Sequence, residues 1–459
     1  MDTTIAAICT PPGDGGIGII RISGDQALPG FRKLFSTKDS KGLTNRHLTY
    51  GKIVDPVTGN MVDEVLAVFM EGPHTYTTED VVEIHCHGGM VPLRRLLSLV
   101  FHQGIQMAAP GEFTKRAFLG GRLDLSQAEA VIDIIQARTD AACDLALAHL
   151  QGRFSETIGQ LRCQLTDVMV HLSVNIDYPD EDIEEVERDQ LVVDLHKIQS
   201  QIQQLASDAK QGKLLRDGVQ VSIIGRPNVG KSSLMNLLLR EARAIVTDIP
   251  GTTRDTIQET LSIGGIPVQL TDTAGIRQTE DVIEQIGIQR SREAMLHADL
   301  VLLLLDNSRP LEEEDHQLLN MVDPRRTLIL FNKADQPPAF TSEEQKGLAG
   351  DCPYLVTSFL ATGQGSAATA IETAIETLLL GGKLHSDGRG VAMGARQEEA
   401  LWQAATAIAA AVQAAEKGLP LELLEIDVAE TYAALGLITG DSVQDDVIDQ
   451  VFSRFCLGK

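Results

Sequence analysis

Four short motifs follow one another between residues 225 and 335, and their order constrains the fold more than any other feature of the chain. They are GRPNVGKSS at residues 225–233, PGTTRD at 250–255, DTAG at 272–275 and NKAD at 332–335. The first matches the pattern G-x-x-x-x-G-K-[ST] between an apolar run and a helical pattern, so it predicts a strand, a phosphate loop and a helix. The strand-like and helical runs that alternate around these motifs predict a doubly wound parallel sheet.

The first and last motifs predict opposite ends of a nucleotide site. Gly225 and Gly230 allow the backbone to turn its N–H groups toward phosphates at a helix N-terminus. Lys231 would reach the β- and γ-phosphates, and the hydroxyl of Ser232 would bind Mg²⁺. The two carboxylate oxygens of Asp335 can accept both N–H edges of guanine, which adenine lacks, so NKAD favours GTP over ATP.

The remaining motif residues complete this predicted site. Thr253 is a candidate second hydroxyl ligand for Mg²⁺, present only when the γ-phosphate is bound. Asp272 ends an apolar run, where its carboxylate can hold the Mg²⁺ sphere through water, and Gly275 can offer its N–H to the γ-phosphate. Asn332 and Lys333 would brace the last loop and cover the base.

The position after DTAG indicates unusual hydrolysis chemistry. Ras-like proteins carry a glutamine there that orients the attacking water, whereas this chain carries Ile276. Asn228 could instead coordinate a monovalent cation at the place where an arginine finger would put its charge. Glu284 is the leading carboxylate for orienting the water, and an exposed helix carboxylate is the alternative interpretation. Arg254 is near in sequence, but its neighbours define no geometry.

Composition limits the partners and the cellular setting. The chain has 459 residues and a net charge of −25, so an RNA partner would need a local basic patch or a more basic companion protein. No apolar run is long enough to span a membrane, and the N-terminus lacks the regions of a signal peptide. The six cysteines have no paired spacing, which favours a reduced, cytoplasmic setting.

Changes of pattern predict a multidomain fold, α/β with an all-α part. Residues 1–118 read as mixed α/β, with strands GIGIIRIS, EVLAVFMEG and DVVEIHCHGG. Residues 119–217 and 381–459 carry helical periodicity and form one helical domain, interrupted by an inserted nucleotide-binding domain at residues 218–380. The strands expected in the inserted domain are VQVSIIG, PVQLTD, LVLLLLD, TLILFN and PYLVTS.

The chain is predicted to end on an amphipathic helix and a short tail. We expect Ser442 to cap this helix, with apolar residues on one stripe: Val443, Val447, Ile448, Val451, Phe452 and Phe455. The tail contains Cys456 and ends at Lys459. A frayed chain end is the alternative to a functional tail.

The chain closely resembles the MnmE/TrmE family of tRNA-modifying GTPases over its whole length. The segments that carry the resemblance are TPPGDGGIGIIRISG, PGEFTKRAFLGGRLDLSQAEA, LLRDGVQVSIIGRPNVGKSSLMN, VTDIPGTTRD, DTAGIR, EQIGI, NKAD and the terminal FCLGK. The resemblance implies an N-terminal folate-binding domain that also forms a homodimer, a helical domain and an inserted Ras-like P-loop G domain. It further implies that the G domains meet when GTP and K⁺ are bound, which stimulates hydrolysis.

The resemblance also implies roles for individual residues in the G domain. Asn228 matches the family's K⁺-binding asparagine, joined by the backbone at Thr247, Ile249 and Thr252, and Glu284 matches its catalytic glutamate. The GTP contacts are then expected at the following positions: Asn228, Val229, Gly230, Lys231, Ser232, Ser233, Thr247, Asp248, Ile249, Pro250, Gly251, Thr252, Thr253, Asp272, Thr273, Ala274, Gly275, Asn332, Lys333 and Asp335. The fifth G-domain box, TSFLATGQG at residues 357–365, departs from the family's S-A-x-T-G-x-G, so its side-chain roles stay open.

Outside the G domain, the resemblance implies a tetrahydrofolate site. Arg21, Glu83 and Arg122 match positions that bind a formyl-tetrahydrofolate, and 5-formyl and methylene forms both stay open. Cys456 and Lys459 match the C-terminal motif implicated in the modification site, Cys456 as a catalytic residue and Lys459 toward the folate. Independently, strand alternation places Glu83, His85 and His87 on one face, where a solvated surface is the alternative and two histidines alone make no metal site.

The implied function is a K⁺-stimulated GTPase that modifies carbon five of the wobble uridine in certain tRNAs. A tetrahydrofolate would supply the one-carbon unit, and a partner subunit containing FAD would carry the redox chemistry. One alternative is a ribosome-assembly GTPase that binds ribosomal RNA, which predicts a basic appendage or a tandem G domain that this acidic chain lacks. A regulatory folate sensor without a part in the chemistry is another.

Overall fold

The computed structural model describes residues 3–177, 185–241, 258–272, 295–359, 364–380, 391–441 and 443–459. These residues divide into two compact units. Unit 1 comprises Met1–Ile132, His149–Gln199 and Glu399–Lys459, and unit 2 comprises Asp133–Ala148 and Ser200–Glu398. The boundaries expected at residues 118, 217 and 380 stay predictions.

Unit 1 contains a seven-stranded sheet in the order β3-β4-β5-β6-β2-β1-β7. Its neighbours pair antiparallel, except that β1 and β7 are parallel. The strands are β1 (Ile5–Ile8), β2 (Gly15–Ser23), β3 (Phe35–Ser36), β4 (Thr49–Val54), β5 (Met61–Met70), β6 (Val81–Gly88) and β7 (Gln106–Met107). The three strands expected from the sequence in this region are confirmed as β2, β5 and β6.

Two helices, α1 (Ala27–Arg32) and α2 (Met90–Phe101), cover one face of this sheet. Alternating residues of the strands point toward them, so Ile20, Ile22 and Ile84 are fully buried in the same core as Phe31 and Leu96. On the other face, Glu83 and His85 of β6 are partly exposed and His87 is exposed, as strand alternation predicted, whereas Val81 at the start of the strand is buried. The polar residues of β6 are therefore free to build a site there.

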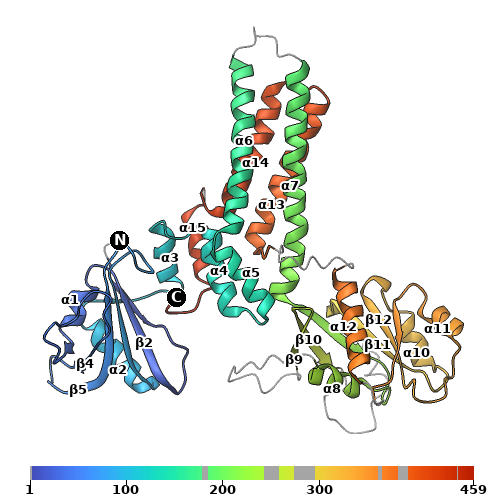
Figure 1. Ribbon diagram of the computed structural model, residues 1–459, viewed down its shortest axis with the longest axis horizontal. Helices are drawn as coiled ribbons and strands as arrows, with labels where there is room; N and C mark the ends of the chain where they lie inside the picture. Colours follow the sequence, from blue (N-terminus) through green and yellow to red (C-terminus); the bar gives the residue numbers. More distant parts are fainter. Residues whose placement is uncertain are drawn as a thin grey trace. The chain divides into compact units, whose positions relative to one another are not determined.

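Unit 1 also contains two long helices, α6 and α14, that lie side by side (Figure 1). Helix α6 lies along α14, and Ser173 Oγ donates a hydrogen bond of 3.1 Å to Glu425. The further helices with residues in unit 1 are α3 (Glu112–Leu119), α4 (Leu125–Gln136), α6 (Arg153–Asp177), α7 (Glu185–Asp217), α13 (Ala395–Glu416), α14 (Leu421–Thr439) and α15 (Asp445–Phe452). Helix α5 (Asp140–Leu150) has most of its residues in unit 2, as does the second half of α7. Among the helices in the described ranges, none has the length and apolar character that a membrane crossing requires.

The last helix differs from the sequence prediction at its start. Helix α15 begins at Asp445 and its N-cap is Gln444, whose backbone is extended and whose side chain makes no cap hydrogen bond. The prediction that Ser442 caps this helix is therefore wrong, because the chain turns into the helix two residues later; Ser442 itself lies outside the described residues. The apolar stripe is confirmed, since Ile448, Phe452 and Phe455 are buried against α3 and α4.

Unit 2 contains a six-stranded sheet in the order β13-β12-β11-β8-β10-β9. Five strands are parallel, as a doubly wound sheet requires, and confirm the five expected strands. The sixth, β9, is an antiparallel edge strand that the sequence analysis missed. The strands are β8 (Val219–Ile224), β9 (Gln258–Ile263), β10 (Ile266–Asp272), β11 (Leu300–Asp306), β12 (Thr327–Asn332) and β13 (Tyr354–Val356).

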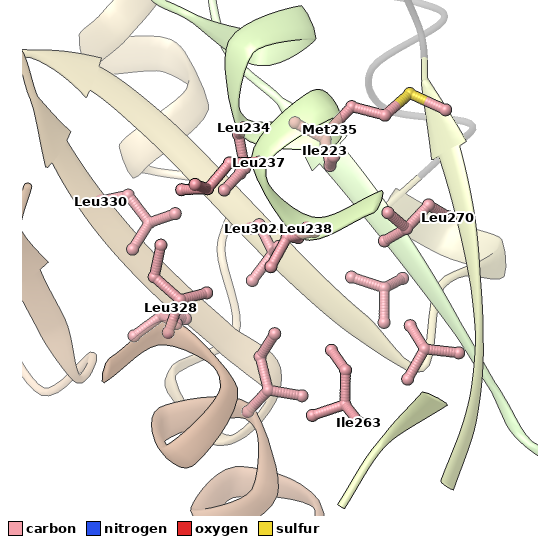
Figure 2. Close-up of a cluster of buried hydrophobic side chains, with 14 of the residues drawn as sticks. Ile223, Leu234, Met235, Leu237, Leu238, Ile263, Leu270, Leu302, Leu328 and Leu330 are labelled. Carbon is pink, nitrogen blue, oxygen red and sulfur yellow. The ribbon is translucent and has the colours of Figure 1, made fainter. Parts of the chain in front are cut away.

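Helices cover both faces of this sheet. On one face, Leu302 of β11 and Leu330 of β12 pack with Leu238 of α8 (Lys231–Glu241) and with α12 (Gln364–Leu380), as Figure 2 shows for part of this core. On the other face, Leu303 and Leu305 pack with α10 (Glu313–Leu319) and α11 (Ser342–Ala349). Burial on both faces explains why β11 reads as a continuous run of leucines.

Candidate functional site

The phosphate loop leaves β8 in a conformation that depends on glycine. Gly225 and Gly230 have φ values of 150° and 109°, and Asn228 has a φ of 63°. A Cβ at Gly225 would lie 2.6 Å from the carbonyl oxygen of Leu304, and one at Gly230 would lie 2.2 Å from Nδ2 of Asn332. The loop is therefore pressed against the carboxyl ends of β11 and β12, where doubly wound sheets bind their ligands.

Lys231 opens the helix that follows the loop. Its ammonium donates hydrogen bonds of 2.5 Å to the carbonyl oxygen of Gly225 and 2.9 Å to that of Arg226. The side chain thus crosses back over the loop, which is the direction in which a β- or γ-phosphate would lie. Ser232 and Ser233 are exposed in the first turn of α8, where phosphate and Mg²⁺ ligands are expected.

The NKAD loop follows β12 and contacts the phosphate loop directly. Asn332 Nδ2 donates a 2.7 Å hydrogen bond to the carbonyl oxygen of Val229, while its buried Oδ1 has no hydrogen-bond partner among the described residues. The Asp335 carboxylate accepts a 2.5 Å hydrogen bond from Ser358 Oγ. Ser358 belongs to the fifth box, whose side-chain roles the sequence left open; the structure thus supplies one.

Lys333 of the same loop is held by a buried carboxylate. Its φ is 66°, and its ammonium donates a 2.7 Å hydrogen bond to Asp306, which is 5% exposed at the end of β11. Burial acts to raise the pKa of Asp306, but hydrogen bonds from Lys333 and Ser308 outweigh it, and the net pKa of Asp306 is lowered. Asp306 therefore stays ionised and anchors the loop at neutral pH.

Of the DTAG motif, Asp272 is the last residue of β10, and its backbone pairs in register with Ile223 of β8. This register brings the end of β10 next to the start of the phosphate loop. The other predicted residues of the central motifs lie outside the described residues: Thr247, Asp248, Ile249, Pro250, Gly251, Thr252, Thr253, Arg254, Thr273, Ala274, Gly275, Ile276 and Glu284.

A second group of predicted residues meets on the open face of the sheet in unit 1. Arg21 of β2 and Glu83 of β6 face each other in register, and the guanidinium lies 2.8 Å from the carboxylate. His85 Nε2 lies 3.7 Å from Glu83, whereas His87 turns to Asp63 at 2.6 Å. The two histidines thus have different partners.

One aromatic residue joins this ion pair to Arg122. The guanidinium carbon of Arg21 lies 5.2 Å from the centre of the Tyr76 ring, and that of Arg122 lies 4.6 Å from it. Arg21 also lies 5.6 Å from the Phe113 ring. Three predicted folate residues, Arg21, Glu83 and Arg122, therefore lie close together. The rings of Tyr76 and of the buried Phe113 lie beside them, which the sequence analysis missed because no motif marks either residue.

The C-terminal tail lies against the same region and is not frayed. Phe455 is buried, and a Cβ at the buried Gly458 would lie 2.2 Å from the carbonyl oxygen of Ile8. Burial raises the pKa of the Cys9 thiol, while the positive charges of Arg21 and Lys459 act to lower it. Lys459 and Arg21 therefore both lie near Cys9. Cys456 is exposed between these two anchored positions.

The parallel sheet, the glycine-dependent phosphate loop and the NKAD loop in contact with it together define a P-loop protein of the GTPase class. The family profile described as "MnmE helical domain" matches residues 125–456, and the one described as "GTP-binding protein TrmE N-terminus" matches residues 4–122. The chain belongs to the MnmE family, which confirms the resemblance seen in the sequence.

Individual relatives match along the full length. The "tRNA modification GTPase MnmE" of Alkaliphilus oremlandii (strain OhILAs) is 45% identical over 462 residues, covering 100% of each chain. The protein of the same name from Geobacillus kaustophilus (strain HTA426) is 47% identical over 460 residues, covering 99% of each. Among solved structures, the G domain of the T. maritima FeoB iron transporter is 25% identical, covering 34% of this chain and 96% of its own, with a TM-score of 0.25.

Proposed function

We propose that this chain is a GTP hydrolase that acts in tRNA modification. The observation that carries the GTPase assignment is the pair of contacts between its loops, Asn332 to Val229 and Ser358 to Asp335. The first fixes the distance between phosphate and base loops, and the second orients the carboxylate that reads guanine. The assignment to tRNA modification rests on the full-length relatives, which are named as tRNA modification GTPases.

The residues of the phosphate loop fit a magnesium nucleotide. Ser232 and Thr253 would supply hydroxyl ligands to Mg²⁺, with Asp272 acting through water, and Mg²⁺ would neutralise phosphate charge. Lys231 would leave its two carbonyl acceptors for the phosphates, since a charged acceptor gives the stronger hydrogen bond. Glu284 would orient the attacking water.

Asn228 is our candidate for holding K⁺. Its side chain is exposed at the turn of the loop, and backbone oxygens of Thr247, Ile249 and Thr252 would complete the site. A bound K⁺ would add positive charge beside the phosphates, where charge develops in the transition state. Because family resemblance alone supplies the other ligands, the salt dependence of hydrolysis is the direct test.

Replacing K⁺ with Na⁺ should slow GTP hydrolysis by roughly tenfold or more, because Na⁺ is too small for a site shaped to K⁺. Asn228→Gly should abolish the difference between the salts, since glycine tolerates a φ of 63° and removes only the side chain. Asn320→Ala, at the exposed end of α10, is the control and should keep the full K⁺ dependence. Equal rates for the unaltered chain in both salts would remove Asn228 from this role.

For the open sheet face of unit 1, we propose a tetrahydrofolate site made by Arg21, Glu83, Arg122 and Lys459. Glu83 is partly buried, so its carboxylate is suited to accept N–H groups of a pterin ring, and the Tyr76 ring offers a flat apolar surface. Since Arg21 is paired with Glu83, it orients that carboxylate, and Arg122 is the cation better placed for the ligand's glutamate tail. Arg122→Ala should weaken binding of a polyglutamylated folate more than of a folate without its tail; equal losses would exclude this assignment.

The modification itself would use carbon five of the wobble uridine, the folate one-carbon unit and an FAD-containing partner subunit. We further propose a homodimer through residues 1–118 and a cytoplasmic setting, which the six free cysteines favour. A ribosome-assembly role would require a basic RNA-binding appendage, and the family to which the chain belongs favours tRNA instead.

Changing Cys456 to serine should abolish the wobble modification and leave GTP turnover unchanged, because this thiol lies in unit 1 and the nucleotide loops lie in unit 2. The measurement is the mass of wobble nucleosides in tRNA from cells that carry the variant. Cys163→Ser is the matched control, since Cys163 is a free, exposed thiol on α6. Unchanged modification in Cys456→Ser would favour a regulatory folate sensor instead.

A further inference from the structure

We propose that Arg226 is a positioning residue that ties the phosphate loop to the guanine-reading loop through a relay of ion pairs across the start of α10. The relay consists of Arg226, Glu312, Glu314, Arg309, Asp306 and Lys333. It rests on the proposed GTPase function, and it assigns a role to a phosphate-loop residue that contacts no expected part of the nucleotide.

The first half of the relay fastens the phosphate loop. Nε of Arg226 lies 2.6 Å from Glu314 and its terminal nitrogen lies 2.5 Å from Glu312. Glu312 is the N-cap of α10, where it shares a capping box with Asp315. These carboxylates are therefore fixed by a helix end, and they hold the loop two residues before Asn228.

The second half reaches the NKAD loop. Arg309 lies 2.6 Å from Glu312, 3.5 Å from Asp306 and 3.6 Å from Asp315. Asp306 in turn holds the ammonium of Lys333 at 2.7 Å. Asp306, through which the relay reaches Lys333, is 5% exposed, so this end of the relay is less screened than a surface pair. Glu312, which joins Arg226 to Arg309, is 57% exposed and is held by its contacts with both arginines.

The contacts of Arg226 argue against a direct role on the transition state. The hydrogen bonds that Arg226 donates to Glu312 and Glu314 raise its pKa against the opposing effect of burial, so its guanidinium is held by two carboxylates. An arginine that neutralises developing phosphate charge must be free to turn toward it. Arg226 instead sets the geometry of the loop, and its loss should act on nucleotide affinity.

The test compares Arg226→Ala with Arg325→Ala in the full chain. Arg325 is also paired to a carboxylate of this unit, Asp323, but its side chain is 90% exposed. We expect Arg226→Ala to lower the affinities for GTP and for GDP by roughly tenfold, with an unchanged kcat under saturating GTP. Arg325→Ala should leave both affinities and kcat unchanged. Arg226→Lys should recover part of the affinity, because it keeps one charge but not the two-sided contact.

A double-mutant cycle identifies the relay itself. The double variant with Arg226→Ala and Arg309→Ala should lose less affinity than the product of the fold-losses of the two single variants. The reason is that either substitution alone already breaks the same chain of contacts. Glu314→Gln provides a second, gentler break and should lower affinity in the same direction. Independent effects in the cycle, or a fall in kcat with affinity intact, would overturn the proposal. Failure of the unaltered chain to bind GTP would instead overturn the GTPase assignment.

Discussion

Replacing Asp335 with asparagine is expected to weaken GTP binding by roughly a hundredfold or more and to turn base preference toward xanthosine triphosphate. The carboxylate offers acceptors to both N–H edges of guanine, whereas the amide sets an N–H donor against one of them. Xanthine carries a carbonyl oxygen at that position, which can accept from the amide. Calorimetry of the variant with both triphosphates measures the two affinities.

Two further variants isolate the cause of this change. Ser358→Ala should weaken GTP binding less than Asp335→Asn does. Loss of the Ser358 hydroxyl frees the Asp335 carboxylate but leaves both of its acceptor oxygens in place. Asp351→Asn, an exposed carboxylate of the same unit, should leave binding unchanged. If Asp335→Asn kept its preference for GTP, guanine would have to be read elsewhere and the assignment of NKAD would be wrong.

Changing Gly230 to alanine is expected to reduce GTP affinity by roughly two orders of magnitude and to lower the melting temperature of the chain. The added Cβ would lie 2.2 Å from Asn332 Nδ2, the atom that holds the phosphate loop through Val229. The φ of 109° would in addition be strained for any residue with a side chain. Titration with GTP and a thermal melt measure the two effects.

Two control glycines separate the clash from the strain. A Cβ added at Gly59 would meet nothing within 4 Å, but the φ there is 71°. Gly59→Ala should therefore lower the melting temperature and leave GTP affinity unchanged. Gly347→Ala, inside α11 and also in open space, should keep binding and gain a little stability as alanine replaces a helical glycine. Normal GTP affinity in Gly230→Ala would show that Asn332 does not need to contact the phosphate loop.

The parallel strands of unit 2 could be predicted because each is a short apolar run at a motif boundary. In β11, both faces are covered by helices, so its leucines are continuous and the strand is distinct from an amphipathic helix. Strand β9, QETLSI, was missed because it is an edge strand with only two buried apolar residues, Leu261 and Ile263, and its pairing depends on the turn at Gly264 and Gly265 rather than on an apolar run. The predicted cap of α15 was wrong because Ser442 satisfies the local preference for a cap residue, whereas the helix has its N-cap at Gln444.

The parts of the candidate sites that depend on contacts between distant residues could not be predicted from the sequence. Motif spacing located Lys231, Asn332 and Asp335, but the contact of Asp335 with Ser358 follows from the parallel pairing of β12 with β13. Likewise, the sequence grouped Arg21 and Glu83 only through resemblance, while their ion pair comes from the register of β2 and β6. Tyr76 carries no local signal at all. Register and loop packing are tertiary properties that a single sequence does not display.

The central claim is that unit 2 recognises guanosine triphosphate. The most direct test is to titrate the full chain with GTP and with ATP at equal Mg²⁺ and K⁺ concentrations. The contacts described for Asn332, Asp335 and Ser358 predict binding of GTP at least roughly a hundredfold tighter than of ATP. Equal affinities for the two nucleotides would contradict the account.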